Sequence, residues 1–331
     1  MPFWTKKSGH NRYRILFATD IHGSEPTFRK FINAAKIYEV NTLILGGDVT
    51  GKMLVPIIEA GNKTYHATLQ SNFYVLKEDE LGEFEAKLGK LGFYAAKMNE
   101  EEYRYYIENP QEVEHLYRAK AKERLISWIH LAEERLATHN IRCYITGGND
   151  DAPEVLEVLP EEAKEFVIPC EGKIISLNEE GYTLISLGQS NPTPWHTPRE
   201  VEEDGLSQLI ENSVQSIQDF SKVIFNFHAP PIDSTLDTCP KLDTSTDPPT
   251  VITAGGEPVM YGAGSIAVRK AIERYQPLLS LHGHIHESRG VIKIGRTVAI
   301  NPGSEYGEGI LRGAIVTLVS DKVENTQMTS G

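Results

Sequence analysis

Residues 14–23 read RILFATDIHG, an apolar run that stops at a carboxylate and an imidazole. The apolar and β-branched residues of the run predict a buried strand. Asp20 and His22, which follow it, are side chains that bind hard or borderline metal ions. Because alternate residues of an extended segment share one face, the two side chains point to the same side. The stretch therefore predicts a strand that carries two candidate metal ligands at its carboxyl end.

The same arrangement occurs four more times along the chain. The apolar runs at 42–45, 143–146, 223–227 and 278–281 are followed by GGD at 46–48, GGND at 147–150, His228 and HGHIH at 282–286. Strands of one sheet bring their carboxyl ends together even when they lie far apart in sequence. We therefore expect carboxylates, imidazoles and a carboxamide around one point. Such a set suits two cations about 3.5–4 Å apart that share a bridging carboxylate.

Composition limits the classes of protein and partner. The chain has 331 residues, of which 40% are hydrophobic and 24% charged, as in an ordinary globular protein. Its 33 Lys and Arg against 46 Asp and Glu give a net charge of -13, which repels nucleic acid and anionic lipid on average. A small-molecule substrate is therefore favoured over a polynucleotide. The composition does not indicate an oligomeric state.

The cysteines and the apolar runs indicate a cytoplasmic protein without membrane contact. Cys143, Cys170 and Cys239 are odd in number and widely spaced, so a disulfide framework is disfavoured and a reducing compartment fits. Residues 1–14 contain no apolar core of signal-peptide length. No stretch approaches the roughly 18 apolar residues that a membrane helix needs.

Apolar spacing predicts a helix over residues 25–40, with Ser24 as its cap and Pro26 in its first turn. A strand at 42–45 then follows, which makes a right-handed β-α-β unit with a parallel pair. We expect a single domain over 1–331, with roughly 52–112 as a mainly helical insertion or cap. Further expected elements are a hairpin at 55–76, helices at 77–109, 111–138, 201–220 and 265–275, strands at 173–177, 182–187 and within 291–318, and a loop at 233–256.

The blocks D-x-H, G-D, G-N-x-D, H and G-H-x-H occur here in the order in which the calcineurin-like metallophosphoesterases carry them, and the chain resembles that family over nearly its whole length. The resemblance implies an α/β fold in which a two-sheet β-sandwich is flanked by helices, as four αββα layers. It also implies two groups of ligands. These are Asp20, His22 and His286 for one metal, Asn149, His228 and His284 for the other, and Asp48 as the bridge.

The family's activity implies a phosphoester hydrolase, and the archaeal and bacterial small-molecule phosphodiesterases and phosphatases are the most similar members. A water or hydroxide that bridges the two cations would attack phosphorus in line. Imidazole and oxygen donors suit Mn, Fe, Zn or Ni better than Ca or Mg alone, although Mg stays among the candidates. His282 has no counterpart among the family's ligands, so we expect it to pack behind the site.

One residue departs from the family pattern. Many members have histidine after Asn149, where the imidazole can donate to the leaving group, but this chain has Asp150. Either the chemistry depends on the metals and on good leaving groups, or Asp150 has a raised pKa and acts as the acid. A phosphodiester is favoured because loss of the histidine most weakens cleavage of poor leaving groups. Asp151, next in the chain, is expected to cap the following helix.

Other candidates and other functions stay open at this point. His196 and Arg199 could contact a substrate phosphate, or could belong to an exposed loop. We expect the Asn301–Ser304 segment to pack near the site. Tyr261 and Tyr306 could stack on a nucleobase, or could be ordinary loop tyrosines. The alternatives to an enzyme of small phosphoesters are a catalytically weak protein-binding scaffold of the same fold and, third, a nuclease, which the acidic charge disfavours.

Overall fold

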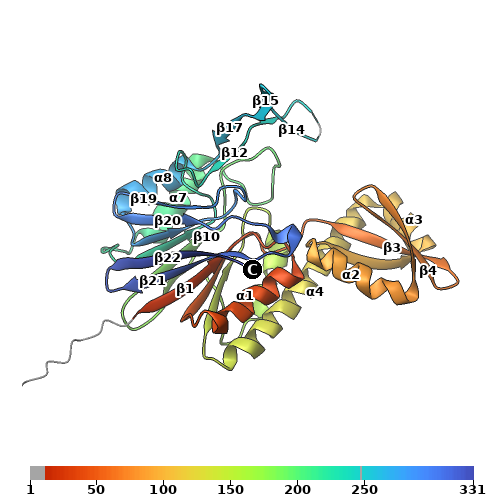
Figure 1. Cartoon of the computed structure of the whole chain (residues 1–331), viewed down its shortest axis with the longest axis horizontal. Helices are drawn as coiled ribbons and strands as arrows, with labels where there is room; N and C mark the ends of the chain where they lie inside the picture. The colour runs from red at the N-terminus through yellow and green to blue at the C-terminus, as the bar shows by residue number, and fades with distance from the viewer. Residues whose placement is uncertain (1–11, 247) are drawn as a thin grey trace, which may run out of the picture.

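The computed structural model describes residues 12–246 and 248–331, and its core consists of two six-stranded sheets packed together (Figure 1). The first sheet has the order β22 (Lys322–Ser330), β21 (Arg312–Val319), β1 (Tyr13–Ala18), β2 (Thr42–Gly46), β7 (Arg142–Thr146) and β8 (Val167–Pro169). The second has the order β19 (Gly290–Ile294), β20 (Thr297–Asn301), β18 (Leu279–Leu281), β11 (Val223–Phe227), β10 (Thr183–Leu187) and β9 (Ile174–Ser176). The expected two-sheet architecture is confirmed.

The pattern of β1 explains why its sequence is apolar throughout. Ile15 and Phe17 face the second sheet and pack in one core with Ile224. Leu16 and Ala18 face the other way and pack in a separate core under helices. A central strand that is buried on both faces therefore needs a continuous apolar run rather than an alternating one.

Helices cover the outer face of each sheet and complete the four layers. On the first sheet lie α1 (Glu25–Ile37), α4 (Pro110–Ala137), α5 (Pro153–Leu156) and α6 (Val158–Glu162), and on the second lie α7 (Glu203–Val214) and α8 (Ile266–Tyr275). The αββα arrangement is thus confirmed. No helix in the described part of the chain is both long enough and apolar enough to span a bilayer, not even the 28-residue α4.

The β-α-β unit at the start of the chain forms as its sequence predicts. Strands β1 and β2 pair in parallel, with Ile15 opposite Thr42, and α1 begins with Pro26 in its first turn. Ser24 occupies the N-cap position, but its hydroxyl does not cap the helix. It donates instead to the carbonyls of Lys90 and Tyr306. The predicted side-chain cap is therefore wrong, and Ser24 connects α1 to two distant loops.

The segment between β2 and α4 is a small α/β unit that projects from one side of the sandwich (Figure 1). It contains β3 (Leu54–Gly61), β4 (Thr64–Leu69), β5 (Asn72–Lys77), η1 (Glu78–Glu80), α2 (Leu81–Lys90), β6 (Tyr94–Asn99) and α3 (Glu100–Glu108). The β3–β4 hairpin was expected, but four strands make this segment mixed rather than mainly helical. The predicted helix over 77–109 is interrupted because β6 pairs in parallel with β3, and that pairing outweighs the helix propensity of its alanines.

The expected loop at 233–256 is largely a narrow hairpin arm, which stands at the top of Figure 1. Its short strands are β12 (Thr238–Pro240), β13 (Leu242–Asp243), β14 (Thr250–Val251), β15 (Thr253–Ala254), β16 (Glu257–Pro258) and β17 (Met260–Gly262). Cys239 pairs with Tyr261 at the base of the arm, and Leu242 pairs with Val251 farther out. A short η2 (Tyr306–Glu308) precedes β21.

Candidate metal centre

The seven candidate ligands follow the carboxyl ends of five parallel strands. The loops after β1, β2 and β7 of the first sheet carry Asp20, His22, Asp48 and Asn149. The loops after β11 and β18 of the second sheet carry His228, His284 and His286. The carboxyl ends of the two sheets thus meet at one place, and each sheet supplies part of the set.

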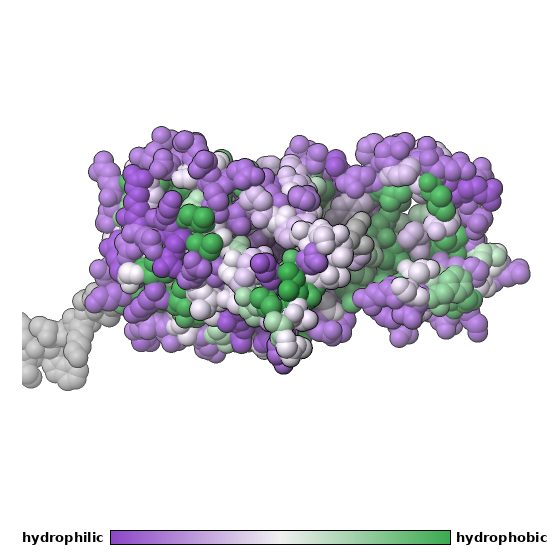
Figure 2. All heavy atoms as spheres, turned by 90° about the horizontal axis from the view of Figure 1, so that it is seen from above, coloured by the Kyte–Doolittle hydropathy of each residue, from purple (hydrophilic) through white to green (hydrophobic). Residues whose placement is uncertain are grey.

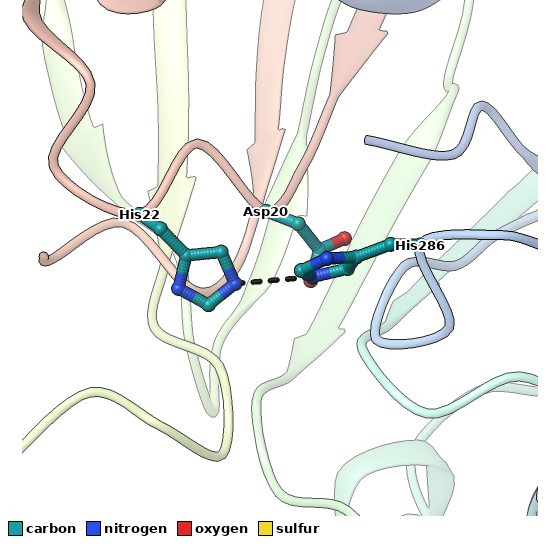
Figure 3. A group of neighbouring side chains, drawn as sticks. All are labelled: Asp20, His22 and His286. Carbon is teal, nitrogen blue, oxygen red and sulfur yellow. Dashed lines mark hydrogen bonds and ion pairs between the residues drawn. The ribbon is translucent and has the colours of Figure 1, made fainter. Parts of the chain in front are cut away.

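The first group consists of Asp20, His22 and His286. One ligand atom from each lies within 4.8 Å of the others. The Nε2 atoms of His22 and His286 are 3.1 Å apart and face each other (Figure 3). His286 Nε2 is also 3.4 Å from Asp20 Oδ1. Two imidazole nitrogens and a carboxylate oxygen therefore converge on a single point.

The second group consists of Asp48, His228 and His284, and a third, His22, Asp48 and Asp150, connects it to the first. One ligand atom from each of the three lies within 4.8 Å of the others. Asp48 Oδ2 is 3.4 Å from His228 Nε2 and 3.6 Å from His22 Nε2. A carboxylate that reaches both groups is in the position expected of a bridge between two cations.

Of the buried atoms in this region that are left without a hydrogen bond, two are placed to bind a cation. Asn149 Oδ1 and His228 Nε2 have no partner among the described residues. The opposite atom of each side chain is occupied, since Asn149 Nδ2 donates to Thr197 Oγ1 at 2.7 Å and His228 Nδ1 donates to Gly46 O at 3.0 Å. Buried polar atoms are rarely left unpaired without a reason. The residues present therefore fit a pair of divalent cations held by nitrogen and oxygen donors.

The charges of the metal-free site follow from the same contacts. Burial raises the pKa of Asp20, but the hydrogen bond from His286 and the charge of His228 outweigh it and bring that pKa to about 2. Burial lowers the pKa of His228, but Asp48 outweighs it and raises that pKa to about 9. Desolvation lowers the pKa of His284 to about 4. At neutral pH His228 is therefore protonated, and a cation that binds to this imidazole must displace the proton.

The backbone of the candidate ligands is strained. Asp20, His22, Asp48 and His284 all have positive φ, at 52°, 39°, 48° and 68°. Such values are uncommon for residues other than glycine, and they cluster at functional sites where the surrounding structure holds them in place. The strain therefore supports a functional role for these four positions.

Glycines make room for the ligands. Gly47 has a φ of 116°, and a Cβ there would lie 2.5 Å from His228 Nδ1. A Cβ on Gly148 would collide with the Asp48 carboxylate. The paired glycines of the GGD and GGND blocks are thus required by the close approach of neighbouring ligand loops.

Lys52 is a residue of this site that the sequence analysis missed. Its Nζ lies 2.9 Å from Asp150 Oδ2, and the same oxygen is 3.8 Å from His22 Nδ1. Burial and the charge of Asp48 raise the pKa of Asp150, whereas Lys52 lowers it. Burial lowers the pKa of Lys52, but Asp150 outweighs it and the net shift is upward. A lysine four residues after the GGD block was the signal that could have identified it.

Asp151 does not cap a helix as expected. Its carboxylate accepts hydrogen bonds from the backbone nitrogens of Val49, Thr50 and Gly148 at 3.0, 2.7 and 2.8 Å. Burial and the nearby charge of Asp48 raise its pKa to about 6. The N-cap residue of α5 is Ala152 instead. Asp151 therefore joins the loops that carry Asp48 and Asn149.

Arg199 and His196, the two candidates for contact with a substrate phosphate, lie in different surroundings. The Arg199 guanidinium donates to Gly148 O at 2.9 Å and pairs with Glu171, and only 9% of the residue is exposed. Arg199 therefore contacts the loop that carries Asn149, and it is buried rather than part of an exposed loop. His196 is exposed, with a φ of 51°, beside Trp195 and Thr197.

His282 and Asn301, the last residue of β20, pack behind the ligands, as expected. His282 Nδ1 donates to the carbonyls of Phe227 and Ala229 at 2.8 and 3.0 Å, on either side of His228. Burial lowers its pKa to about 4, so it is neutral. Asn301 Nδ2 donates to Gly283 O and Ile285 O at 3.2 and 3.0 Å, and thereby fixes the loop of His284.

The candidate ligands open onto a cavity of about 790 Å³. Asp48, Lys52, Asn149, His284 and His286 line one end of it. The other end is lined by the loop after β10 and by the hairpin arm. This volume is in the range of pockets that bind small molecules.

Comparison with known proteins connects this geometry to a family. A family model described as calcineurin-like phosphoesterase matches residues 13–288. An uncharacterized protein of Methanocaldococcus jannaschii is 30% identical over 157 residues, which are 47% of this chain and 61% of that protein, so the match spans less than two thirds of the relative.

Two solved structures align with nearly the whole chain. One, at 14% identity, covers 96% of this chain and 99% of its own with a TM-score of 0.55, which indicates a shared fold. A dimetal phosphatase from Danio rerio covers 96% of this chain and 95% of its own, at 9% identity and a TM-score of 0.45.

Proposed function

The chain belongs to the calcineurin-like phosphoesterase family, and we propose that it is a hydrolase that cleaves a small-molecule phosphodiester with two divalent cations. The observation that carries the proposal is the pair of ligand groups with the Asp48 carboxylate between His22 of one and His228 of the other. A family assignment alone would not select the reaction, because one fold supports many functions. The converging side chains supply the chemical argument.

We assign Asp20, His22 and His286 to one cation, and Asn149, His228 and His284 to the other, with Asp48 shared. Six of these seven residues fall in two of the three groups whose atoms lie within 4.8 Å of one another, and the third group adds Asp150 to His22 and Asp48. Asn149 is supported by its unpaired, buried Oδ1. The mixture of imidazole and oxygen donors favours Mn, Fe, Zn or Ni, with Mg also admitted.

When bound, the cations would lower the pKa of an attacking water and offset charge on the phosphoryl oxygens. The protein's own contribution at this end of the cavity is the Lys52–Asp150 pair. Asp150 holds the Lys52 ammonium at 2.9 Å, beside the candidate ligands. We assign Lys52 the role of donating a charged hydrogen bond to a phosphoryl or leaving-group oxygen. Asp150 then positions Lys52 rather than serving as the acid itself.

The substrate is proposed to be a small diester. A cavity of about 790 Å³ accommodates a small molecule. A net charge of -13 opposes a polynucleotide, so the nuclease alternative stays disfavoured. Three cysteines free of disulfides agree with the proposed cytoplasmic location.

The test is hydrolysis of bis(p-nitrophenyl) phosphate by the full chain with Mn²⁺, with p-nitrophenyl phosphate run in parallel. We expect metal-dependent release of p-nitrophenol, faster from the diester, and none from Asp48→Asn above background. Faster turnover of the monoester would instead identify a phosphatase. Absence of metal-dependent turnover on both esters would favour the protein-binding scaffold, for which the replacement of histidine by Asp150 is the supporting feature.

A further inference from the structure

The cavity has a second, apolar end away from the candidate ligands. Its exposed side chains there are Trp195, Tyr261 and Val251, with 59, 39 and 46% of each residue accessible. Pro192, Pro194, Pro240 and Leu242 line the same end. Seen from above, the molecule shows apolar residues in several separate places within a mostly hydrophilic surface (Figure 2). We call Trp195, Tyr261, Val251 and Leu242 the aromatic rim.

The rim is uncharged. Among the described residues that line the cavity, the charged carboxylates and ammonium are Asp48, Lys52, Asp150 and Glu287. All four belong to the loops that carry the candidate ligands. A second phosphate or a charged peptide would therefore find no ionic partner among the described residues that line this end of the cavity. An uncharged group with a flat apolar surface would bury the exposed faces of Trp195 and Tyr261.

The rim is also held in place. Glu200 accepts hydrogen bonds from the backbone nitrogens of Thr193 and Thr197 at 3.0 and 2.9 Å, on both sides of Trp195. Tyr261 lies in β17, which pairs with β12 through Cys239. Asn191 Nδ2 donates to Ala263 O at 3.1 Å and connects the two walls. Because the walls are already ordered, a ligand that binds between them incurs little entropy cost for ordering them.

We propose that the aromatic rim is a subsite for a planar aromatic group of the substrate, which is therefore a nucleoside or aryl phosphodiester. The inference rests on the proposed function, because the rim and the candidate metal ligands line one cavity. The cavity volume of about 790 Å³ holds a phosphoryl group and an attached ring system together. Stacking on Trp195 or Tyr261 would then orient the ester while the other end of the cavity acts on phosphorus.

The kinetic test uses four diesters with the same leaving group, p-nitrophenolate, and with thymidine-5′, phenyl, hexyl or methyl as the second group. Because the leaving group is constant, differences in kcat/KM report how the second group is bound. We expect kcat/KM for the thymidine or the phenyl ester, or both, to exceed that for the methyl ester at least about tenfold, as for one stacked ring. The two aromatic esters also distinguish a nucleoside from an aryl preference.

The variants Trp195→Ala and Tyr261→Ala should each reduce this ratio, and the double variant should bring it to about one. Phe73→Ala is the matched control, because Phe73 is an exposed aromatic residue of β5, outside the residues that line the cavity. It should leave the ratio unchanged. A wild-type ratio near one, an equal preference for the hexyl ester, or a ratio that survives the double variant would each overturn the proposal.

A binding measurement separates failure of the subsite from failure of the proposed reaction. Saturation-transfer NMR with adenosine, which has no phosphate, needs neither metal nor turnover. We expect transfer to the base protons from the wild-type protein and from Phe73→Ala, and its loss in the double variant. If no ester is hydrolysed but this pattern appears, the reaction is wrong and the subsite stands. If esters are hydrolysed but adenosine receives no transfer from the wild type and the phenyl ester has no advantage over the methyl ester, the subsite is overturned.

Discussion

The two ends of the cavity are built in opposite ways. The metal end consists of buried side chains on the ends of paired strands, such as Asp20 and His228, which are 1 and 0% exposed. The aromatic rim consists of exposed side chains on a loop and a hairpin arm, such as Trp195. The metal end must position its ligand atoms to a fraction of an ångström. The aromatic rim need only provide an apolar surface for contact. The reaction is therefore expected to depend on the sheets, and the choice of substrate on the loops.

The largest expected effect is on the metal end, from Asp48→Asn. A carboxylate shared by both ligand groups has no substitute, so at least one cation should be lost. The rate should fall by more than about 100-fold, the upper end for changes to residues that only support a ligand. Metal content by elemental analysis and kcat on the diester measure this. Asp79→Asn, on the surface of the projecting segment, is the control, and full metal content in Asp48→Asn would contradict the shared role.

Lys52→Met should lower kcat about 100-fold while metal content stays the same. The reason is that Lys52 is assigned to the substrate's oxygens and contacts Asp150 rather than a cation. Lys52→Arg should recover part of the rate because it keeps the charge. Lys63→Met, which removes an exposed lysine paired with Glu78, is the matched control. An unchanged kcat in Lys52→Met, or loss of metal, would show that Lys52 has a different role.

The two ends should also respond differently to pH. In the metal-free protein His228 has a pKa of about 9, so below that pH a cation must displace its proton. Metal affinity should therefore fall by about tenfold for each pH unit below 9. Calorimetry in buffers of different ionisation enthalpy should detect at least one proton released on binding at pH 7, because, against the effect of burial, the Asp20 carboxylate also raises the pKa of His286. Affinity that does not change with pH would contradict this.

Binding at the rim should not change over the same pH range. Burial raises the pKa of Cys239 to about 11 and also raises the pKa of Tyr261. Neither side chain therefore changes charge between pH 6 and 9. The ratio of kcat/KM for aromatic and methyl esters, measured at several pH values, should be constant across this interval. A ratio that changes with pH would contradict the proposed difference between the two ends.

The smallest effect is expected from shortening the arm. Pro240 and Met260 pair directly, so residues 241–259 can be replaced by Asn-Gly, which closes a two-residue hairpin. This change removes Leu242 and Val251 but keeps Trp195 and Tyr261. Metal content should stay the same, and the preference for aromatic esters should fall by only about two- to fivefold, as expected for partial loss of apolar contact. Loss of metal would mean that the arm supports both ends.

The sequence was sufficient for the parts that depend on apolar runs. The run at 223–227 predicts β11 (Val223–Phe227) with its observed bounds, and its end places His228. The convergence of the ligand loops follows from the parallel pairing of such strands. The order of the motif blocks then supplied the family and the division into two groups, while the ligand roles themselves stay proposals.

The sequence was insufficient where a role depends on the path of a loop. Lys52 looks like any surface lysine until its loop brings it to Asp150, about a hundred residues later in the chain. Arg199 looks exposed in a proline-rich loop, but Glu171 on a different connection buries it. Strand β6 was missed because its partner β3 is distant in sequence and its alanines favour a helix. Each failure reflects a tertiary contact that no local pattern encodes.

The division of the ligands between two sheets has a consequence for the stability of the fold. Asp20, Asp48 and Asn149 belong to one sheet, and His228, His284 and His286 to the other. Bound cations would therefore crosslink the two sheets of the sandwich. At a free concentration 100 times the dissociation constant, one such ion adds about 2.7 kcal/mol to the free energy of unfolding. A chelator should accordingly lower the melting temperature of the whole sandwich, rather than loosen one loop.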